Sequence, residues 1–397
     1  MAETLSARLP VPRSGLRPLR LALVTSSYNY IQDGVALTLN RLVRYLENQG
    51  VEVLVFAPIA KQPAFDHAGE LSPVPSIPLP LRSEYRLALG LPAAARRRLE
   101  AFAPDIIHIA VPDLLGHQAL KLGLRLGCPV VASYHTRYET YLRYYGLDLL
   151  RDPLTRRLAA FYGACREVYV PSASMAEVLI AGGAGGNVHL WPRGVDTVRF
   201  SPAKRRASWR VSHGVGAEDI VVAFVGRLVR EKRLATLLDM FHRLRGAGVR
   251  HRALVVGDGP ERAALESALP EAVFTGLLSG EALADTYACA DIFVFPSDTE
   301  TFGSVTLEAM ASGLPTVCAD ATGSRSLVVP GVTGFLADAA DGEAFFEAVA
   351  TLAADTTLRR RMGAAARTRS LRFSWDETMA GLLTRYDALA AAARQPA

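Results

Sequence analysis

Short apolar runs alternate along most of this chain with longer stretches whose apolar positions recur at helical spacing. Runs that are apolar throughout, each followed by an amphipathic stretch such as 36–49 or 114–126, indicate strands of parallel sheets covered by helices on both faces. The expected strands are 21–26, 51–57, 106–110, 130–134, 168–170 and 188–191 in the first half, and 220–225, 253–256, 273–275, 292–295, 316–319 and 334–336 in the second.

The pattern starts again near the middle of the chain. The runs 21–26 and 221–226 each open a half, and each is followed by a glycine-bearing turn and a helix. Right-handed crossovers then predict an α/β protein with two doubly wound, Rossmann-like domains facing across a cleft. We expect a disordered arm over 1–17, a first domain over 18–198, a linker over 199–218, a second domain over 219–374, and a C-terminal helix over 375–397 that crosses back to the first domain.

Composition supports a globular enzyme that acts in the cytoplasm. The 397 residues carry a net charge of +5 and half of them are apolar, which suits two domains and anionic ligands. The four cysteines stand singly, as buried thiols do in a reducing compartment. No uncharged apolar stretch of about 18 residues occurs, so a membrane span is not expected.

Two groups of residues after strands of the second half suit a diphosphate. In the first group Gly226 permits a tight turn, while Arg227 and Lys232 supply a planar fork and a point charge. In the second group the missing side chain of Gly257, within Gly-Asp-Gly-Pro, lets a ligand approach the backbone. Taken alone, the first group could equally be a solvated charge cluster and the second an ordinary turn.

A more specific pattern follows the strand 292–295. Glu300 and Glu308 flank Thr-Phe-Gly-Ser-Val-Thr-Leu, and a helix is predicted to begin near Ser304. The first N–H groups of that helix can bind a phosphate. Glu300 can reach sugar hydroxyls, and Glu308, one turn into the helix, can accept two hydrogen bonds from a ribose diol.

Two candidates in the first half face the same cleft. His135 follows a strand and can donate to a sugar hydroxyl or assist proton movement, although a single strand-end histidine is more often structural. The loop 31–35, which contains Gly34, precedes the first helix and presents N–H groups to the other domain.

These residues resemble the family 4 glycosyltransferases of the GT-B fold, from about residue 21 to the C-terminal helix. The segment 300–315 carries the most specific resemblance, and the segments 133–136 and 191–197 are similar to those of GDP-mannose-dependent α-mannosyltransferases and sulfoquinovosyl-diacylglycerol synthases. Two positions depart from the family pattern: Asp33 precedes Gly34 where many members have two glycines, and Arg233 stands where many have glycine.

The resemblance implies a role for each candidate. Arg227 and Lys232 would neutralise the departing diphosphate, Glu308 would hold the ribose, and Glu300 with the N–H groups of Phe302 and Gly303 would hold the transferred sugar, which His135 touches. The candidate catalytic residues are His135, Arg227, Lys232 and Glu300; the candidate nucleotide-sugar-binding residues are Gly34, Gly226, Gly257, Phe302, Gly303, Ser304, Val305, Thr306 and Glu308.

The expected activity is retaining, metal-independent transfer of a hexose, of mannose or glucose type, from a nucleotide-diphosphate sugar to an acceptor hydroxyl. No Asp-x-Asp pair follows a strand at the cleft, so a divalent metal is not expected. We also expect no other cofactor and no nucleic-acid partner. Tyrosines 134, 138, 141, 144 and 145 interleave with arginines 137 and 143, and 96–98 is all arginine; these favour a lipid acceptor at an anionic membrane surface, on the inner face of the cell membrane.

Other interpretations stay open at this point. A soluble or polysaccharide acceptor suits the same residues, and a sugar-nucleotide epimerase has the same two-domain fold. A non-catalytic sugar-nucleotide-binding protein would need fewer of these groups. An NAD-dependent oxidoreductase is disfavoured, because the turn after the first strand lacks G-x-G-x-x-G.

Overall fold

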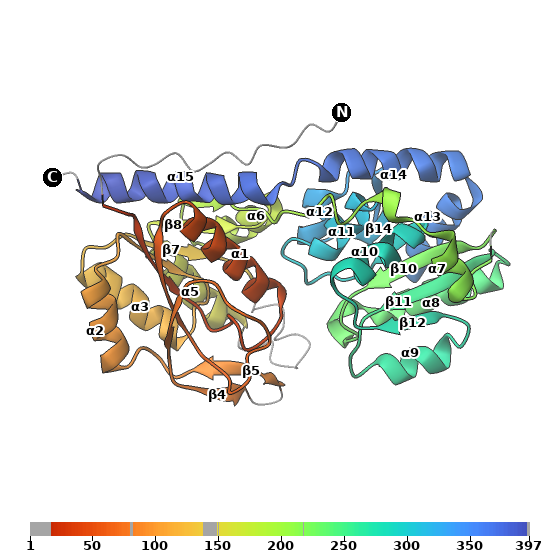
Figure 1. Cartoon of the computed structure of the whole chain (residues 1–397). Helices are drawn as coiled ribbons and strands as arrows, with labels where there is room; N and C mark the ends of the chain where they lie inside the picture. The colour runs from red at the N-terminus through yellow and green to blue at the C-terminus, as the bar shows by residue number, and fades with distance from the viewer. Residues whose placement is uncertain (1–16, 80–81, 138–148, 150, 217, 395–397) are drawn as a thin grey trace.

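The computed structural model describes residues 17–79, 82–137, 149, 151–216 and 218–394. Two parallel sheets covered by helices make up most of it, so the predicted doubly wound α/β fold is confirmed (Figure 1). Apart from Arg17, the arm expected over 1–17 lies outside the described residues.

The first domain is built on seven parallel strands in the order β3-β2-β1-β6-β7-β8-β9. Their bounds are β1 Arg20–Val24, β2 Glu52–Ala57, β3 Glu70–Pro73, β6 Ile106–Ile109, β7 Val130–Ser133, β8 Glu167–Val170 and β9 Val188–Leu190. The helices around them are α1 Gly34–Asn48, α2 Ala93–Phe102, α3 Leu114–Arg125, α5 Arg151–Gly163 and α6 Ala173–Ala181.

Alternate residues of the strands feed cores on the two faces of this sheet. In β1, Leu21 and Leu23 pack with α1 and the C-terminal helix, whereas Ala22 and Val24 pack with α3 and α5. Since successive side chains of a strand point to opposite faces, a run that is apolar throughout can only be a strand covered on both sides.

The second domain has six parallel strands in the order β12-β11-β10-β13-β14-β15. They are β10 Ile220–Val225, β11 His251–Val256, β12 Val273–Gly276, β13 Ile292–Phe295, β14 Thr316–Ala319 and β15 Gly334–Ala337. The helices are α7 Ala207–Ser212, α8 Leu234–Gly246, α9 Arg262–Ala268, α10 Gly280–Cys289, α11 Ser304–Ala311, α12 Thr322–Leu327, α13 Gly342–Ala354 and α14 Thr356–Ser370.

Both sheets reverse their strand order beside the strand that opens each domain. The strand β1 lies between β2 and β6, and β10 lies between β11 and β13. At such a switch point the loops after the strands diverge, which opens a crevice for ligands at the carboxyl ends of the sheet.

Three strands between residues 70 and 88 were not predicted. The edge strand β3 and the antiparallel pair β4 Ser76–Leu79 and β5 Arg82–Ala88 occupy a segment with Pro73, Pro75 and Pro78. Proline is confined to edge strands and turns, so it masked the alternation that would identify these strands.

Residues 199–218 connect the sheets but do not form an extended linker. They contain α7, and Arg210 is buried with its guanidinium bonded to Asp291 (3.0 Å) and to the carbonyl of Asp219 (2.6 Å). This segment therefore packs on the second domain.

The last helix, α15 Trp375–Arg394, leaves the second domain after α14 and lies along the first (Figure 1). Arg385 forms a two-pronged ion pair with Glu167 at the start of β8 (2.7 and 2.8 Å), and Arg394 reaches Asp105 (2.8 Å). The apolar side of α15 completes the core that includes Leu21 and Leu23. Within the part of the chain that the structure describes, no helix is long and apolar enough to span a bilayer.

Candidate active site

The ends of β10 and β11 form one backbone unit. The N–H of Gly226 donates to the carbonyl of Val256 (3.0 Å), and that of Leu228 donates to Asp258 (2.9 Å). Gly257 has φ +136°, and a Cβ there would lie 1.9 Å from the Gly226 carbonyl oxygen. Only glycine fits this approach, so the two glycine-bearing turns predicted separately hold each other in place.

Arg227 and Lys232 lie on this unit in different environments. The Arg227 side chain is 44% exposed, with its Nη2 3.7 Å from Glu231 Oε1. Lys232 is buried, pairs through Nζ with Glu300 Oε1, and lies 5.6 Å from the ring centroid of Phe295. The structure thus joins two predicted site residues, the lysine from the β10 turn and the carboxylate that follows β13.

Arg233 affects more than the start of the next helix. It precedes α8 with φ +54° and ψ +46°, a left-handed conformation that costs a residue with a Cβ about 1 kcal/mol. Its Nη2 and Nε bond to Asp298 Oδ2 at 2.5 and 3.1 Å. The backbone conformation accounts for glycine as the usual residue here, and the ion pair ties the turn to the segment that leads to Glu300.

The N-terminus of α11 offers backbone groups more than side chains. Gly303 starts the helix with φ +91°. Phe302 packs its ring on Phe373 (centroids 5.9 Å apart), and Thr306 is fully buried, with its hydroxyl 3.8 Å from Cys318 Sγ. The N–H groups of the first helical turn lack intrahelical acceptors, so the contribution of residues 302–306 to an anion is through the main chain.

Glu308 lies one turn further along α11, beside the hydroxyl of Tyr287. That hydroxyl lies 3.2 Å from Glu308 Oε2 and 3.1 Å from the carbonyl of Val305. Burial raises the pKa of Glu308 to about 7, and the hydrogen bond from Tyr287 opposes that rise. Burial disfavours the charged carboxylate, and hydrogen bonds donated by the two hydroxyls of a ligand diol would stabilise it.

His135 is held by a chain of hydrogen bonds that the sequence did not indicate. Because a guanidinium only donates, Arg193 Nη2 donates to His135 Nδ1 (3.0 Å), and the His135 proton is then on Nε2, facing Ser133 Oγ (2.8 Å). The Ser133 hydroxyl can donate in turn to His108 Nε2 (2.8 Å), whose Nδ1 lies 2.6 Å from the hydroxyl of Tyr386 on α15.

This arrangement keeps both histidines neutral. Burial lowers the pKa of His135 well below its usual range, and Arg193 and His108 lower it further. Burial lowers the pKa of His108 to about 3. Protein groups thus contact both ring nitrogens of His135, and its role toward a sugar stays a prediction.

Hydrogen bonds connect His135 to the segment around Glu300 in the other domain. The Thr301 hydroxyl donates to the main-chain carbonyl of His135 (3.0 Å), and the Ser172 hydroxyl donates to the carbonyl of Thr301 (2.9 Å). The strand-end histidine of the first domain therefore contacts the segment around Glu300 in the second domain.

The loop before α1 is shaped by Asp33. Its carboxylate caps the helix by accepting from the N–H of Ala36 (2.8 Å) and also accepts from the Ser27 hydroxyl (3.0 Å). Gly34 is exposed, with nothing within 4 Å of the position of a Cβ. Asp33 replaces the usual first glycine with a helix cap and leaves open space in front of Gly34.

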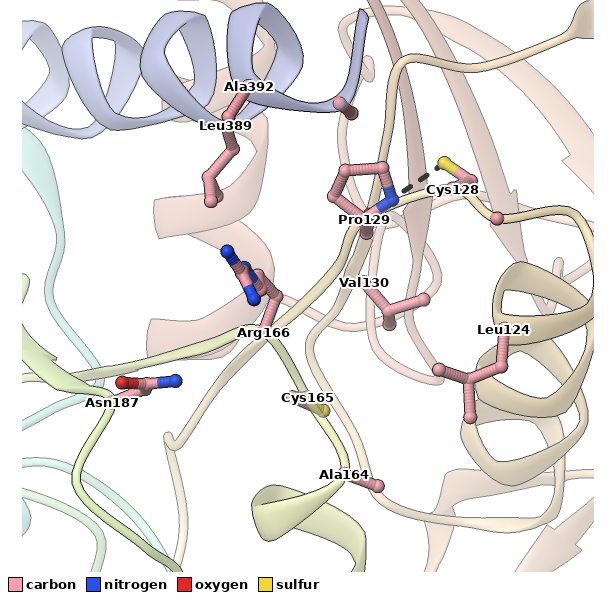
Figure 2. Close-up of a pocket in the computed structure, with 12 residues that line it drawn as sticks. Leu124, Cys128, Pro129, Val130, Ala164, Cys165, Arg166, Asn187, Leu389 and Ala392 are labelled. Atoms are coloured by element: carbon pink, nitrogen blue, oxygen red, sulfur yellow. Dashed lines mark hydrogen bonds between the residues drawn. The ribbon is translucent and has the colours of Figure 1, made fainter. Parts of the chain in front are cut away.

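The cysteines take no part in this site. Burial raises the pKa of Cys128, Cys165 and Cys318 to about 12, so these thiols stay protonated. Two of them line a cavity of about 470 Å³ below α15 (Figure 2). Its other lining residues include Pro129 and Arg166, which precede β7 and β8. The cavity therefore lies at the amino ends of the strands, whereas the candidate site lies at their carboxyl ends. Across the described ranges, no three His, Cys, Asp or Glu side chains are grouped to hold a metal ion.

The two doubly wound domains have the GT-B fold, which solved structures share. A sucrose-phosphate synthase from Thermosynechococcus elongatus superposes over 94% of this chain and all of its own, with a TM-score of 0.79 and 22% identity. Anabaena HepE in complex with UDP covers 93% of this chain and all of its own, with a TM-score of 0.75 and 18% identity.

Sequence comparisons give the family. Residues 32–199 match the model described as Glycosyltransferase Family 4, and residues 205–369 match Glycosyl transferases group 1. A GDP-mannose-dependent alpha-mannosyltransferase of Mycobacterium tuberculosis is 37% identical over 94% of this chain and 97% of its own. Sulfoquinovosyl transferase SQD2 of Arabidopsis thaliana is 34% identical over 94% of this chain and 74% of its own. The chain belongs to the family 4 glycosyltransferases, as the resemblance indicated.

Proposed function

We propose that this glycosyltransferase moves a mannosyl group from GDP-mannose to a hydroxyl of a membrane lipid, with retention of configuration and without a metal ion. The observation that carries the proposal is the Lys232–Glu300 ion pair before the N-terminus of α11, because a cation beside a carboxylate suits a diphosphate joined to a sugar.

The choice of donor rests on the relatives. GDP-mannose-dependent alpha-mannosyltransferases of Mycobacterium tuberculosis and Corynebacterium glutamicum are 37% and 34% identical and each aligns with more than nine-tenths of this chain. The equally similar SQD2 supports a second candidate donor, a nucleotide-linked sulfoquinovose.

Leaving-group stabilisation is assigned to the protein's own cations. Arg227 and Lys232, together with the first N–H groups of α11, are the groups suited to stabilise the negative charge that develops as the bond between the sugar and the diphosphate breaks. The acceptor hydroxyl attacks the anomeric carbon on the face that the diphosphate leaves, and a diphosphate oxygen takes the hydroxyl proton. No carboxylate is assigned as a covalent nucleophile.

A lipid acceptor suits the hairpin β4–β5. Exposed apolar side chains gather on this hairpin and just after it, at Ile77, Leu79, Leu87 and Leu89. The N–H of Arg86 donates to the Tyr30 hydroxyl (3.1 Å), which donates to the carbonyl of Ser26 in the loop after β1 (2.7 Å). These hydrogen bonds connect the hairpin to the loop after β1, and its exposed apolar side chains are suited to contact a bilayer there. Of the tyrosines on which the lipid prediction first rested, Tyr134 is buried in the core of the first domain, packed on Tyr162, and does not offer a membrane surface. Tyrosines 138, 141, 144 and 145 lie outside the described residues.

Arg97 on α2, which follows this hairpin, is exposed and would face anionic head groups, contributing about 1 kcal/mol near the surface, whereas Arg96 donates to the Leu91 carbonyl and Arg98 pairs with Glu70. We accordingly place the reaction at the inner face of the cell membrane.

A donor panel against a total lipid extract tests this proposal. We expect mass spectrometry to show a hexosyl lipid with GDP-mannose and little or none with UDP-glucose, UDP-galactose or UDP-glucuronate. A sulfoquinovosyl lipid from the corresponding UDP-sugar would favour the second candidate. Conversion of the donor sugar in the absence of any acceptor would show an epimerase and contradict the proposal.

A further inference from the structure

Arg193 is a buried cation with an unused hydrogen-bond donor. It follows β9, is 8% exposed, and donates through Nη2 to His135 Nδ1 (3.0 Å). Its Nη1 is buried and has no hydrogen-bond partner within the part of the chain that the structure describes. A buried guanidinium normally has its N–H groups satisfied, because an unmet charged donor is costly.

Among the described residues, no carboxylate forms an ion pair with this arginine. The charge that acts on it is that of Asp33, whose oxygens already accept from the N–H of Ala36 and the hydroxyl of Ser27. Burial lowers the pKa of Arg193 to about 10, with Asp33 opposing, so the side chain remains charged at neutral pH. As far as the structure describes the chain, this positive charge therefore has no counterion in direct contact.

Arg193 lies where the site segments of both domains meet. His135, which it contacts, accepts through its main chain from Thr301, the residue after Glu300. Asp33, which influences its charge, precedes Gly34 at the open end of α1. These contacts place the guanidinium between the strand-end histidine, which reaches the segment around Glu300, and the loop before α1.

We infer that Arg193 is a substrate-binding residue whose Nη1 donates to a phosphate oxygen. The phosphate comes either from the donor's diphosphate or from an anionic head group of the acceptor, and both present the oxyanion that a guanidinium binds best. The Nη2 bond to His135 orients the guanidinium for this contact. The inference rests on the proposed function for the identity of these two phosphates.

The test compares Arg193→Gln and Arg193→Lys with the wild-type protein, and uses Arg125→Gln, an exposed cation at the end of α3, as a charge-matched control. The donor arm measures the affinity for inorganic pyrophosphate and for GDP by calorimetry. The acceptor arm measures the apparent KM for lipid acceptors in vesicles with a phosphate head group and for neutral diacylglycerol.

We expect Arg193→Gln to weaken binding about tenfold to a hundredfold in one arm, with Arg193→Lys intermediate and Arg125→Gln unchanged. Loss of pyrophosphate affinity assigns the contact to the donor; a raised KM confined to the phosphate-bearing acceptor assigns it to the lipid. The melting temperature of Arg193→Gln should not fall, because a buried charge without a counterion is removed.

Unchanged binding in both arms would overturn the inference, whether the variant shows a lowered melting temperature or only a lowered kcat through misplacement of His135. The calorimetric arm needs no turnover. If the wild-type protein transferred no sugar from any donor yet lost pyrophosphate affinity on Arg193→Gln, the proposed function would fail while the role of Arg193 stood.

Discussion

Lys232→Met is expected to reduce kcat by a factor of about 10² to 10³, the effect of removing one preorganised group that stabilises developing charge. Lys232 is buried against Phe295 and already held by Glu300, so its ammonium does not need to reorganise when the diphosphate departs. Single-turnover kinetics with saturating donor would isolate the chemical step from product release.

Arg230→Met is the matched control, because Arg230 lies two residues away, is 87% exposed, and pairs with Glu261 at the surface. It should leave kcat within about twofold, since surface ion pairs contribute little. Lys232→Arg keeps the charge but changes the shape of the side chain, so its kcat should lie between those of Lys232→Met and Arg230→Met. A kcat for Lys232→Met within threefold of wild type would contradict the assigned role.

Glu308→Ala is expected to weaken donor binding about tenfold to a hundredfold, since the ribose diol loses a charged acceptor worth about 1.5–3 kcal/mol. The raised pKa of Glu308 adds a pH dependence with a definite sign. Diol hydrogen bonds favour the carboxylate form, so binding releases a proton and affinity rises with pH. With a pKa of about 7, the carboxylate fraction increases about tenfold between pH 6 and pH 8.

The measurement is the affinity for an intact nucleotide sugar, because the diester-like diphosphate of the donor does not titrate in this range. Glu308→Gln should bind the nucleotide sugar weakly, and its affinity should not change with pH. The melting temperature of Glu308→Gln at pH 8 should equal or exceed the wild-type value. Because the folded-state pKa of Glu308 is raised to about 7, the wild-type protein loses stability as the pH rises from the pKa of the unfolded state through about 7. A wild-type affinity that does not change between pH 6 and pH 8 would argue against ribose binding by Glu308.

The sheets could be predicted because buried parallel strands are apolar throughout and each is followed by an amphipathic helix. The hairpin β4–β5 could not, because its prolines interrupt the pattern and its apolar side chains are exposed rather than buried. The packing of 199–218 on the second domain was equally hidden. It depends on Arg210 reaching Asp291, a contact between distant residues that no local spacing records.

For the site, local glycine and carboxylate patterns located the groups that we propose bind the donor, since these lie directly after strands. What they left out is how the groups are held. The chain from Arg193 through His135, Ser133 and His108 joins three strand ends to Tyr386, nearly 200 residues further along on α15. Each of these residues alone is unremarkable in the sequence, and the tertiary contacts determine the neutral state of His135.

The anomeric configuration of the product tests the central claim most directly. GDP-mannose, which carries an α-linked sugar, is incubated with the protein and lipid extract in excess EDTA, and the purified glycolipid is analysed by NMR. The account predicts an α-mannosyl lipid that forms at the same rate with or without EDTA, because Arg227, Lys232 and the N-terminus of α11 stabilise the leaving diphosphate. A β-linked product, or transfer that appears only after Mg²⁺ or Mn²⁺ is added back to correctly folded protein, would contradict it.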